Sequence, residues 1–190
     1  MEKVKKIVIF VSGNGSNMSQ IISHFEKDKT ISVSRVFSNK KHCLGIENAK
    51  KAGIDTFTFS RKELGNDEIL SILTEINPDL IVLAGFLLKV PNSITSAFEN
   101  KIINVHPALL PKFGGKGMYG SNVHKAVIET KETKSGITFH YVNENYDEGN
   151  IIEQIECEIT ATDTWENLQQ KIQKLEHENF CSVIEKILLN

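Results

Sequence analysis

Asn104 and His106 are the two residues of the sequence best suited to acyl transfer onto an amine. They belong to the segment Asn-Val-His-Pro-Ala-Leu-Leu-Pro-Lys (104–112), in which an apolar strand is followed by two prolines. Alternation along a strand puts both side chains on the same face. The Asn104 amide could donate to a tetrahedral oxyanion, and the His106 imidazole could stabilise the same charge or assist proton transfer. A buried histidine and a turn asparagine without a catalytic role would also explain the pattern.

An acid, Asp147, lies in the turn Tyr-Asp-Glu-Gly (146–149) between two later strands. Aspartate and glycine are ordinary turn residues, so this segment alone does not indicate catalysis. It does so only if the turn folds over the end of the central strands, where Asp147 could orient His106 or a water that carries protons. His140 lies on the strand that leads into the turn. Because His106, His140 and Asp147 match no standard ligand spacing, we expect no metal.

A glycine-containing loop, Ser-Gly-Asn-Gly-Ser-Asn (12–17), lies between the first predicted strand and the first predicted helix. Glycines let the backbone turn sharply, and a helix N-terminus offers free N–H groups to an anion. The predicted phosphate site consists of Gly13, Asn14, Gly15, Ser16 and Asn17. It is not a dinucleotide fingerprint, because Met18 occupies the third glycine position, and no Gly-Lys-Ser/Thr of a P-loop follows. A tight turn with a polar cap is the alternative.

Two further segments are candidates for ligand binding. Glu176 is four residues from both Ile172 and Phe180, so it borders the apolar side of the last predicted helix. Its carboxylate could bind a cationic group of a ligand or simply reach solvent. The segment 113–117, with three glycines, is either a lid over a site or a simple flexible loop.

The elements that must position these residues alternate along the chain. Continuous apolar runs at 7–11 and 80–84 are typical of strands covered on both faces, and further strands are predicted at 31–37, 54–59 and 101–105. Helical spacing is found at 17–25, 43–52 and 68–76. This succession predicts a doubly wound, mostly parallel α/β sheet. The segments 136–142 and 150–159 predict antiparallel strands at its C-terminal end. The last helix is expected from Asp163 to Leu189, with Asp163 and Glu166 as its capping pair.

Composition restricts the classes of protein that fit. A chain of 190 residues, 40% of them hydrophobic, suits a single domain over 1–190. Its net charge of −2 gives no reason to expect nucleic acid as a partner. No segment approaches the ~20 apolar residues of a membrane span, and the three cysteines form no disulfide framework. We therefore expect a cytoplasmic protein with small-molecule substrates, present as a monomer or weak homodimer.

The order of the motifs is more specific than any one of them. It runs Ser-Gly-Asn-Gly-Ser-Asn (12–17), Val-Phe-Ser-Asn-Lys (36–40), Leu-Ala-Gly-Phe (83–86), the nonamer at 104–112, Asp-Glu-Gly (147–149) and Leu-Glu-His (175–177). In this series and its spacing the whole chain resembles the phosphoribosylglycinamide formyltransferases, the folate-dependent enzymes of purine synthesis.

The resemblance implies transfer of formyl from 10-formyltetrahydrofolate, the co-substrate, to the amine of glycinamide ribonucleotide. By position it implies a catalytic trio of Asn104, His106 and Asp147. It assigns the 13–17 loop and Glu176 to the ribonucleotide. The implied folate-binding residues are Phe86, Leu87, Leu88, Lys89, Val90, Asn104, His140, Val142 and Asp147. Leu88 stands where some relatives carry arginine, so the folate contacts are expected to differ there.

Other functions share parts of this pattern. Methionyl-tRNA formyltransferase has the central motif but is expected to need a basic second domain, for which this sequence leaves no residues. Formyltetrahydrofolate hydrolase is expected to carry a regulatory domain before the first strand. A formyltransferase for another small amine would keep the whole site. A non-catalytic phosphate- or folate-binding module would keep the glycine loop without needing Asn104, His106 and Asp147 together, and turnover distinguishes it from an enzyme.

Overall fold

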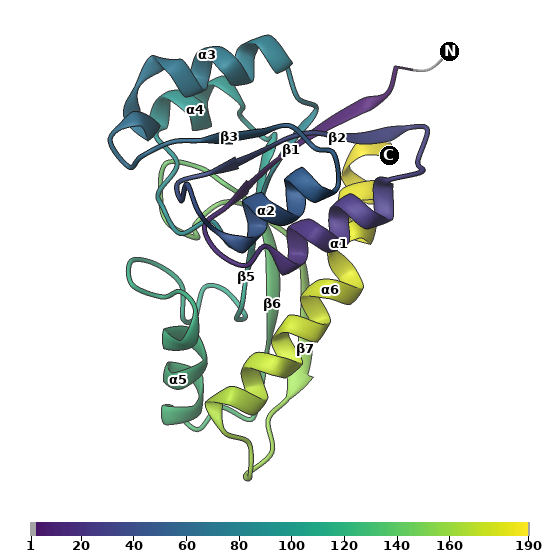
Figure 1. Ribbon diagram of the computed structural model, residues 1–190. Coiled ribbons are helices and arrows are strands. Elements are labelled where there is room, and N and C mark those ends of the chain that lie inside the picture. Colours follow the sequence, from purple (N-terminus) through teal and green to yellow (C-terminus); the bar gives the residue numbers. More distant parts are fainter. Residues whose placement is uncertain (1–2, 190) are drawn as a thin grey trace.

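Five parallel strands and two antiparallel strands form one sheet in the computed structural model, which describes residues 3–189 (Figure 1). Pairing is parallel from β3 to β5 and antiparallel between β5, β6 and β7, so the predicted fold class is confirmed. In spatial order the strands are β3 (Thr56–Thr58), β2 (Ile31–Ser38), β1 (Lys5–Val11), β4 (Leu80–Leu83), β5 (Ile102–His106), β6 (Lys134–Tyr141) and β7 (Ile151–Glu158).

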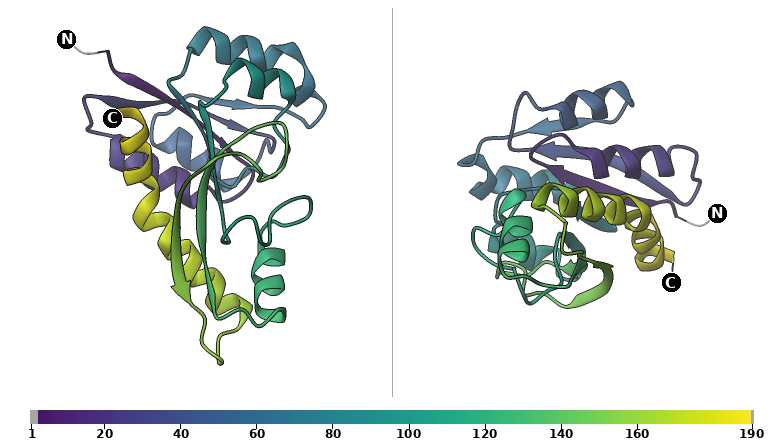
Figure 2. Two further views of the ribbon diagram at one scale, coloured as in Figure 1. Left: turned by 180° about the vertical axis from the view of Figure 1, so that it is seen from behind. Right: turned by 90° about the horizontal axis from the view of Figure 1, so that it is seen from below.

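Helices cover both faces of the sheet, which explains the continuous apolar runs of the central strands. The helices α1 (Ser16–Phe25), α2 (Leu44–Lys51) and the long α6 (Trp165–Leu189) enclose one core. The helices α3 (Asp67–Ile76) and α4 (Asn92–Ala97), with a short 3₁₀ turn at Glu63–Gly65, enclose the other (Figures 1 and 2). The two cores alternate along β1: Ile7 and Ile9 belong to the first, and Val8 and Phe10 to the second. No helix among residues 3–189 is long and apolar enough to cross a membrane.

The strand order reverses at β1, because the chain continues to β2 on one side and to β4 on the other. Loops that leave the carboxyl ends of such neighbouring strands diverge and open a crevice. Ser12 ties three of these strand ends together. Its hydroxyl donates to Asn39 Oδ1 (2.6 Å) and accepts from Leu87 N–H (2.9 Å), and its own N–H donates to the carbonyl of Gly85 (3.2 Å). These hydrogen bonds link the ends of β1, β2 and β4 at the floor of the crevice.

Two helices were not predicted from the sequence. The helix α4 has only six residues and begins with polar ones, too few for a helical period to emerge. The helix α5 (Ser121–Glu129) presents a short buried side, Val123, His124 and Val127, and packs against α6. The helix α6 begins within two residues of the predicted Asp163, but the predicted capping pair Asp163 and Glu166 was wrong. Thr164 and Asn167 exchange side-chain and backbone hydrogen bonds there, whereas Asp163 binds Lys171.

Replacement of Gly136 by alanine tests the β6–β7 pairing. A Cβ at this position would overlap the Ile155 carbonyl oxygen of β7 and lie 2.8 Å from Leu109 Cδ2. Overpacking of this kind costs about 1–3 kcal/mol. We expect Gly136→Ala to lower Tm by several degrees, at roughly 2–4 °C per kcal/mol for a chain of this size. Gly65→Ala is the matched control, because no atom lies within 4 Å of its added Cβ. Equal Tm values for the two variants would contradict the assigned packing.

Candidate active site

A cavity of about 710 Å³ opens at the carboxyl edge of the sheet. Its lining includes all the residues predicted to hold folate and all three predicted catalytic residues. These come from the end of β5, the segment after β4, the end of β6 and the 142–150 loop, which are far apart in the chain. The 146–149 turn therefore folds over the ends of the central strands, which is the condition under which the sequence made Asp147 a candidate.

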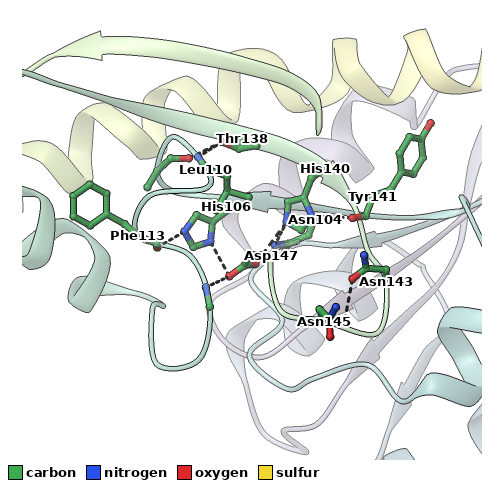
Figure 3. Close-up of polar contacts among 12 residues, drawn as sticks. Asn104, His106, Leu110, Phe113, Thr138, His140, Tyr141, Asn143, Asn145 and Asp147 are labelled. Carbon is green, nitrogen blue, oxygen red and sulfur yellow. Dashed lines mark hydrogen bonds and ion pairs between the residues drawn. The ribbon is translucent and has the colours of Figure 1, made fainter. Parts of the chain in front are cut away.

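Asn104 and His140 form the first contact of the site. They face each other in the antiparallel register of β5 and β6, and Asn104 Nδ2 lies 3.1 Å from His140 Nε2 (Figure 3). His140 Nδ1 lies 2.9 Å from the Tyr141 carbonyl, which can only accept, so the imidazole proton is on Nδ1. Nε2 then accepts from Asn104. This fixes the orientation of the asparagine amide and leaves its second N–H for a ligand.

His106 is held by a backbone carbonyl on one side and faces a carboxylate on the other. Its Nε2 lies 2.7 Å from the Phe113 carbonyl oxygen, so Nε2 donates (Figure 3). Its Nδ1 faces Asp147 Oδ2 at 3.6 Å, and the ring is only 3% exposed. Neutral His106 thus presents an unprotonated Nδ1 to Asp147, and that carboxylate favours arrival of a proton there.

Asp147 connects the two histidines and the 113–117 segment. Its other oxygen lies 3.6 Å from His140 Nε2, and Oδ2 accepts a hydrogen bond from Gly115 N–H at 2.9 Å. Asp147 has a left-handed backbone (φ 55°), unusual for a residue other than glycine. A Cβ at Gly114 would lie 3.3 Å from Asp147 Cβ and 2.6 Å from Leu110 Cδ2. Glycine at 114 therefore allows the two loops to approach, whether or not the segment also acts as a lid.

Three buried histidines lie around this cavity, and burial makes each a weaker base. Burial lowers the pKa of His106 below its usual 6.5, although Asp147 and the Phe113 carbonyl oppose this shift. Burial likewise lowers the pKa of His140, against the effects of the Tyr141 carbonyl and Asp147. Burial, with a smaller contribution from His106, lowers the pKa of His124 to about 4. Its Nδ1 is buried without a hydrogen-bond partner. His124 was not predicted as a site residue.

Glu176 reaches the same cavity from α6. Its Oε2 accepts a hydrogen bond from Asn17 Nδ2 at 2.7 Å, across 159 positions of sequence. Burial raises the pKa of the Glu176 carboxyl, although the Asn17 hydrogen bond acts in the opposite direction. Asn17 Oδ1 is buried and has no partner within the protein. Both residues line the cavity, and the Glu176 carboxyl suits a ligand that carries N–H or O–H donors.

The rest of the predicted phosphate loop is placed differently. Of the loop at 12–17, Ser12 and Asn17 line the cavity, whereas Gly13, Asn14, Gly15 and Ser16 do not. Gly15 has φ 70°, and a Cβ there would lie 2.9 Å from Gly45 Cα. Ser16 Oγ accepts a hydrogen bond from Gln173 Nε2 at 3.3 Å. Glycine at 15 therefore has a steric reason, and the assignment of 13–16 to phosphate stays a prediction.

Several cationic residues of the lining were not assigned from the sequence. Lys40, Arg61 and Lys116 join the predicted Lys89 around the cavity. Lys40 follows β2 and Arg61 follows β3, so both lie toward the opposite end of the sheet from Asp147. Single basic residues in loops carry no spacing pattern, which is why they were missed. Within residues 3–189, no cluster of three or more His, Cys, Asp or Glu is arranged to hold a metal ion.

The family model described as formyl transferase matches residues 5–184 of the sequence. The chain belongs to the formyl transferase family. The resemblance inferred from the motifs is thereby confirmed. The Bacillus subtilis protein named phosphoribosylglycinamide formyltransferase is 36% identical to it over 97% of this chain and 95% of its own length. The Escherichia coli protein of the same name is 33% identical over 94% of this chain and 84% of its own length.

The same name recurs among plant relatives and solved structures. The chloroplastic protein of Arabidopsis thaliana is 39% identical over 96% of this chain, which spans only 65% of that relative's length. A crystal structure of phosphoribosylglycinamide formyltransferase from Anaplasma phagocytophilum has a TM-score of 0.90 and 32% identity, covering 98% of this chain and 88% of that one. The Brucella melitensis protein of that name has a TM-score of 0.88 and 32% identity over 99% and 97%.

The buried histidines predict acid sensitivity of this formyl transferase family member. A histidine whose pKa is lower in the folded protein than in the unfolded chain binds a proton more readily when the chain is unfolded. The folded protein therefore keeps its full stability above pH 6.5 and loses part of it as the pH falls toward the pKa of the folded state. For His124, with a pKa of about 4, the loss of unfolding free energy reaches roughly 3 kcal/mol, at about 1.36 kcal/mol for each unit by which the pKa is lowered.

Urea unfolding at about pH 7.5 and about pH 4 measures this loss. We expect His124→Gln to reduce the difference in unfolding free energy between the two pH values. Thr95→Val, at a buried threonine that does not titrate, should leave the difference unchanged. If His124→Gln unfolds with the same pH dependence as the wild type, His124 is not the neutral buried group described above.

Proposed function

We propose that the chain transfers the formyl group of 10-formyltetrahydrofolate to the amine of glycinamide ribonucleotide, releasing tetrahydrofolate. One observation supports this proposal above the others. An asparagine amide, an imidazole and a carboxylate from separate segments converge in the lining of a single cavity. That set can stabilise an oxyanion and move a proton, the two requirements of formyl transfer between nitrogens. Membership of the formyl transferase family supports the same reaction.

The two substrates would enter the cavity from opposite faces of the sheet. The segment Phe86–Val90 adjoins the core formed with α3 and α4, and with His140 and Val142 it would hold the folate. Asn17 and Glu176 belong to α1 and α6 on the other face, and they would hold the ribonucleotide. The predicted loop 13–17 would place the phosphate at the N-terminus of α1. Lys40 and Arg61 would add positive charge for anionic groups of the substrates.

The chemical step begins with attack of the neutral substrate amine on the formyl carbon. The formyl oxygen becomes an oxyanion, which accepts the free N–H of Asn104. The fixed orientation of that amide means that little reorganisation is needed as the charge develops. His106 would lie beside the oxyanion, and a proton on its Nδ1 would place positive charge next to that oxygen. Asp147 then stabilises that imidazolium.

Collapse of the tetrahedral intermediate breaks the bond between the formyl carbon and the folate nitrogen. The attacking nitrogen must lose a proton, and the departing nitrogen must gain one. Asp147, directly or through a water, would carry that proton. The 3.6 Å separations between Asp147 and both histidines allow the contacts to shorten when substrates exclude solvent, as is common in ligand-free sites.

Removal of either oxyanion-stabilising group tests the proposal. We expect His106→Ala and Asn104→Ala to lower kcat by about 10²–10³, the usual effect of losing one oxyanion donor. Folate absorbance after mixing protein, 10-formyltetrahydrofolate and glycinamide ribonucleotide measures turnover. His24→Ala, a surface histidine, is the matched control and should keep wild-type kcat.

The wild-type protein gives a second test of the proposal. Turnover without the ribonucleotide would indicate hydrolysis or another acceptor. Folded protein that shows no turnover at all would favour a binding module.

Asp147→Asn tests the proton-transfer role separately from binding. The amide keeps the shape of the carboxylate but cannot carry the proton or stabilise an imidazolium. We expect kcat to fall at least about 10²-fold, with small changes in KM for either substrate. Asp55→Asn, at an exposed aspartate paired with Arg35, serves as the control. An unchanged kcat in Asp147→Asn would remove Asp147 from the mechanism.

A further inference from the structure

The segment that follows His106 is held by side chains of β6 and β7. Thr138 Oγ1 donates to the Ala108 carbonyl (2.7 Å) and accepts from Leu110 N–H (3.0 Å). Gln154 Nε2 donates both to the Leu110 carbonyl (2.9 Å) and to Thr138 Oγ1 (2.9 Å). We call these two residues the Thr138–Gln154 clamp. It binds three backbone polar groups of the segment 108–110.

The Thr138 hydroxyl and the Gln154 amide nitrogen use all their hydrogen-bonding positions. A threonine hydroxyl has one donor and two acceptor positions, and a glutamine amide nitrogen has two donors. Thr138 is fully buried, and Ala108 and Leu110 are also buried. The prolines at 107 and 111 prevent the segment from joining the sheet, so its backbone groups need other partners. Without Thr138 the Ala108 carbonyl and the Leu110 N–H would lie buried and unpaired, which costs about 1–3 kcal/mol for each group.

The clamped segment leads directly into the contacts of the two central side chains. Phe113, three residues after Leu110, supplies the carbonyl that accepts from His106 Nε2. Gly115, two residues further, supplies the N–H that binds Asp147 Oδ2. Figure 3 shows the Leu110–Thr138 bond beside the His106–Phe113 and His106–Asp147 contacts. The clamp therefore acts on the site through the position of 113–115, without touching the cavity: neither Thr138 nor Gln154 belongs to its lining.

We propose that Thr138, assisted by Gln154, is a positioning residue that keeps His106 in the tautomer with its proton on Nε2 and aligned with Asp147. This inference rests on the proposed formyl transfer for its kinetic consequence only. The tautomer of His106 is a property of the free protein and can be measured without substrate.

The kinetic test compares two substitutions of one side chain. Thr138→Val keeps the shape but removes the hydroxyl, whereas Thr138→Ser keeps the hydroxyl and loses one methyl group. Because a displacement of about 1 Å can cost about 10² in rate, we expect Thr138→Val to lower kcat by about 10–100-fold with little change in KM. Thr138→Ser should retain kcat within about threefold, since it preserves the hydrogen bonds.

The substrate-free test uses the imidazole ¹⁵N chemical shifts of His106, which distinguish the two neutral tautomers. Wild type and Thr138→Ser should show the Nε2–H form, and Thr138→Val should show a mixture of both. Thr95→Val is the matched control, a buried threonine on α4 whose hydroxyl also binds a backbone carbonyl (Asn92, 3.2 Å). It should change neither kcat nor the His106 tautomer.

Each outcome is decisive for the clamp. A wild-type tautomer and wild-type kcat in folded Thr138→Val would overturn the inference, as would equal losses in Thr138→Val and Thr95→Val. If Thr138→Val does not fold, Gln154→Leu carries the test. Gln154 lies on the exposed side of β7, and its loss should lower kcat about threefold to tenfold with a partial tautomer mixture. A wild-type protein that lacks turnover but shows the Nε2–H form would contradict the proposed function and leave the clamp intact.

Discussion

The site depends on how one carboxylate, Asp147, is held between two buried neutral histidines. An ionised group with little exposure needs compensating partners. Asp147 accepts a hydrogen bond from the Gly115 N–H, and His106 and His140 each lie 3.6 Å from one of its oxygens. Protonation of His106 at Nδ1 would complete that compensation. The Asp147 carboxylate therefore favours binding of one proton at the place where the proposed reaction must move one. Burial opposes the same protonation by lowering the pKa of His106.

Asp147 can lie between the two histidines because strand pairing changes from parallel to antiparallel at β5. On one side β5 pairs in parallel with β4, and its carboxyl end opens into the crevice. On the other side it pairs antiparallel with β6, so Asn104 lies directly opposite His140. The antiparallel connection from β6 to β7 then returns over the same edge and carries Asp147 into it. A fully parallel sheet would need a helical crossover there and would not place a short loop over the site.

Much of this was predictable because the deciding information is local. Apolar runs predicted the buried strands, and strand alternation predicted that Asn104 and His106 share a face. The convergence of Asp147 depended on the condition that its turn folds over the sheet, which the sequence could state but not decide. Partners that are backbone atoms, such as the Phe113 carbonyl, leave no residue type to recognise. Thr138 could not be recognised for a related reason, because threonine is common in strands and its presence there indicates no special role.

The glycine loop shows why residue type alone can be ambiguous. Gly15 adopts a left-handed conformation and packs against Gly45, so the fold requires glycine at this position even without a ligand. The same close packing brings α1 to the edge of the crevice and sets Asn17 against Glu176 from α6. Asn17 and Glu176 are 159 positions apart, yet a hydrogen bond joins their side chains in the lining of the cavity. A glycine that serves packing can thus also matter for binding, because it determines how closely the start of α1 approaches α2 beside the cavity.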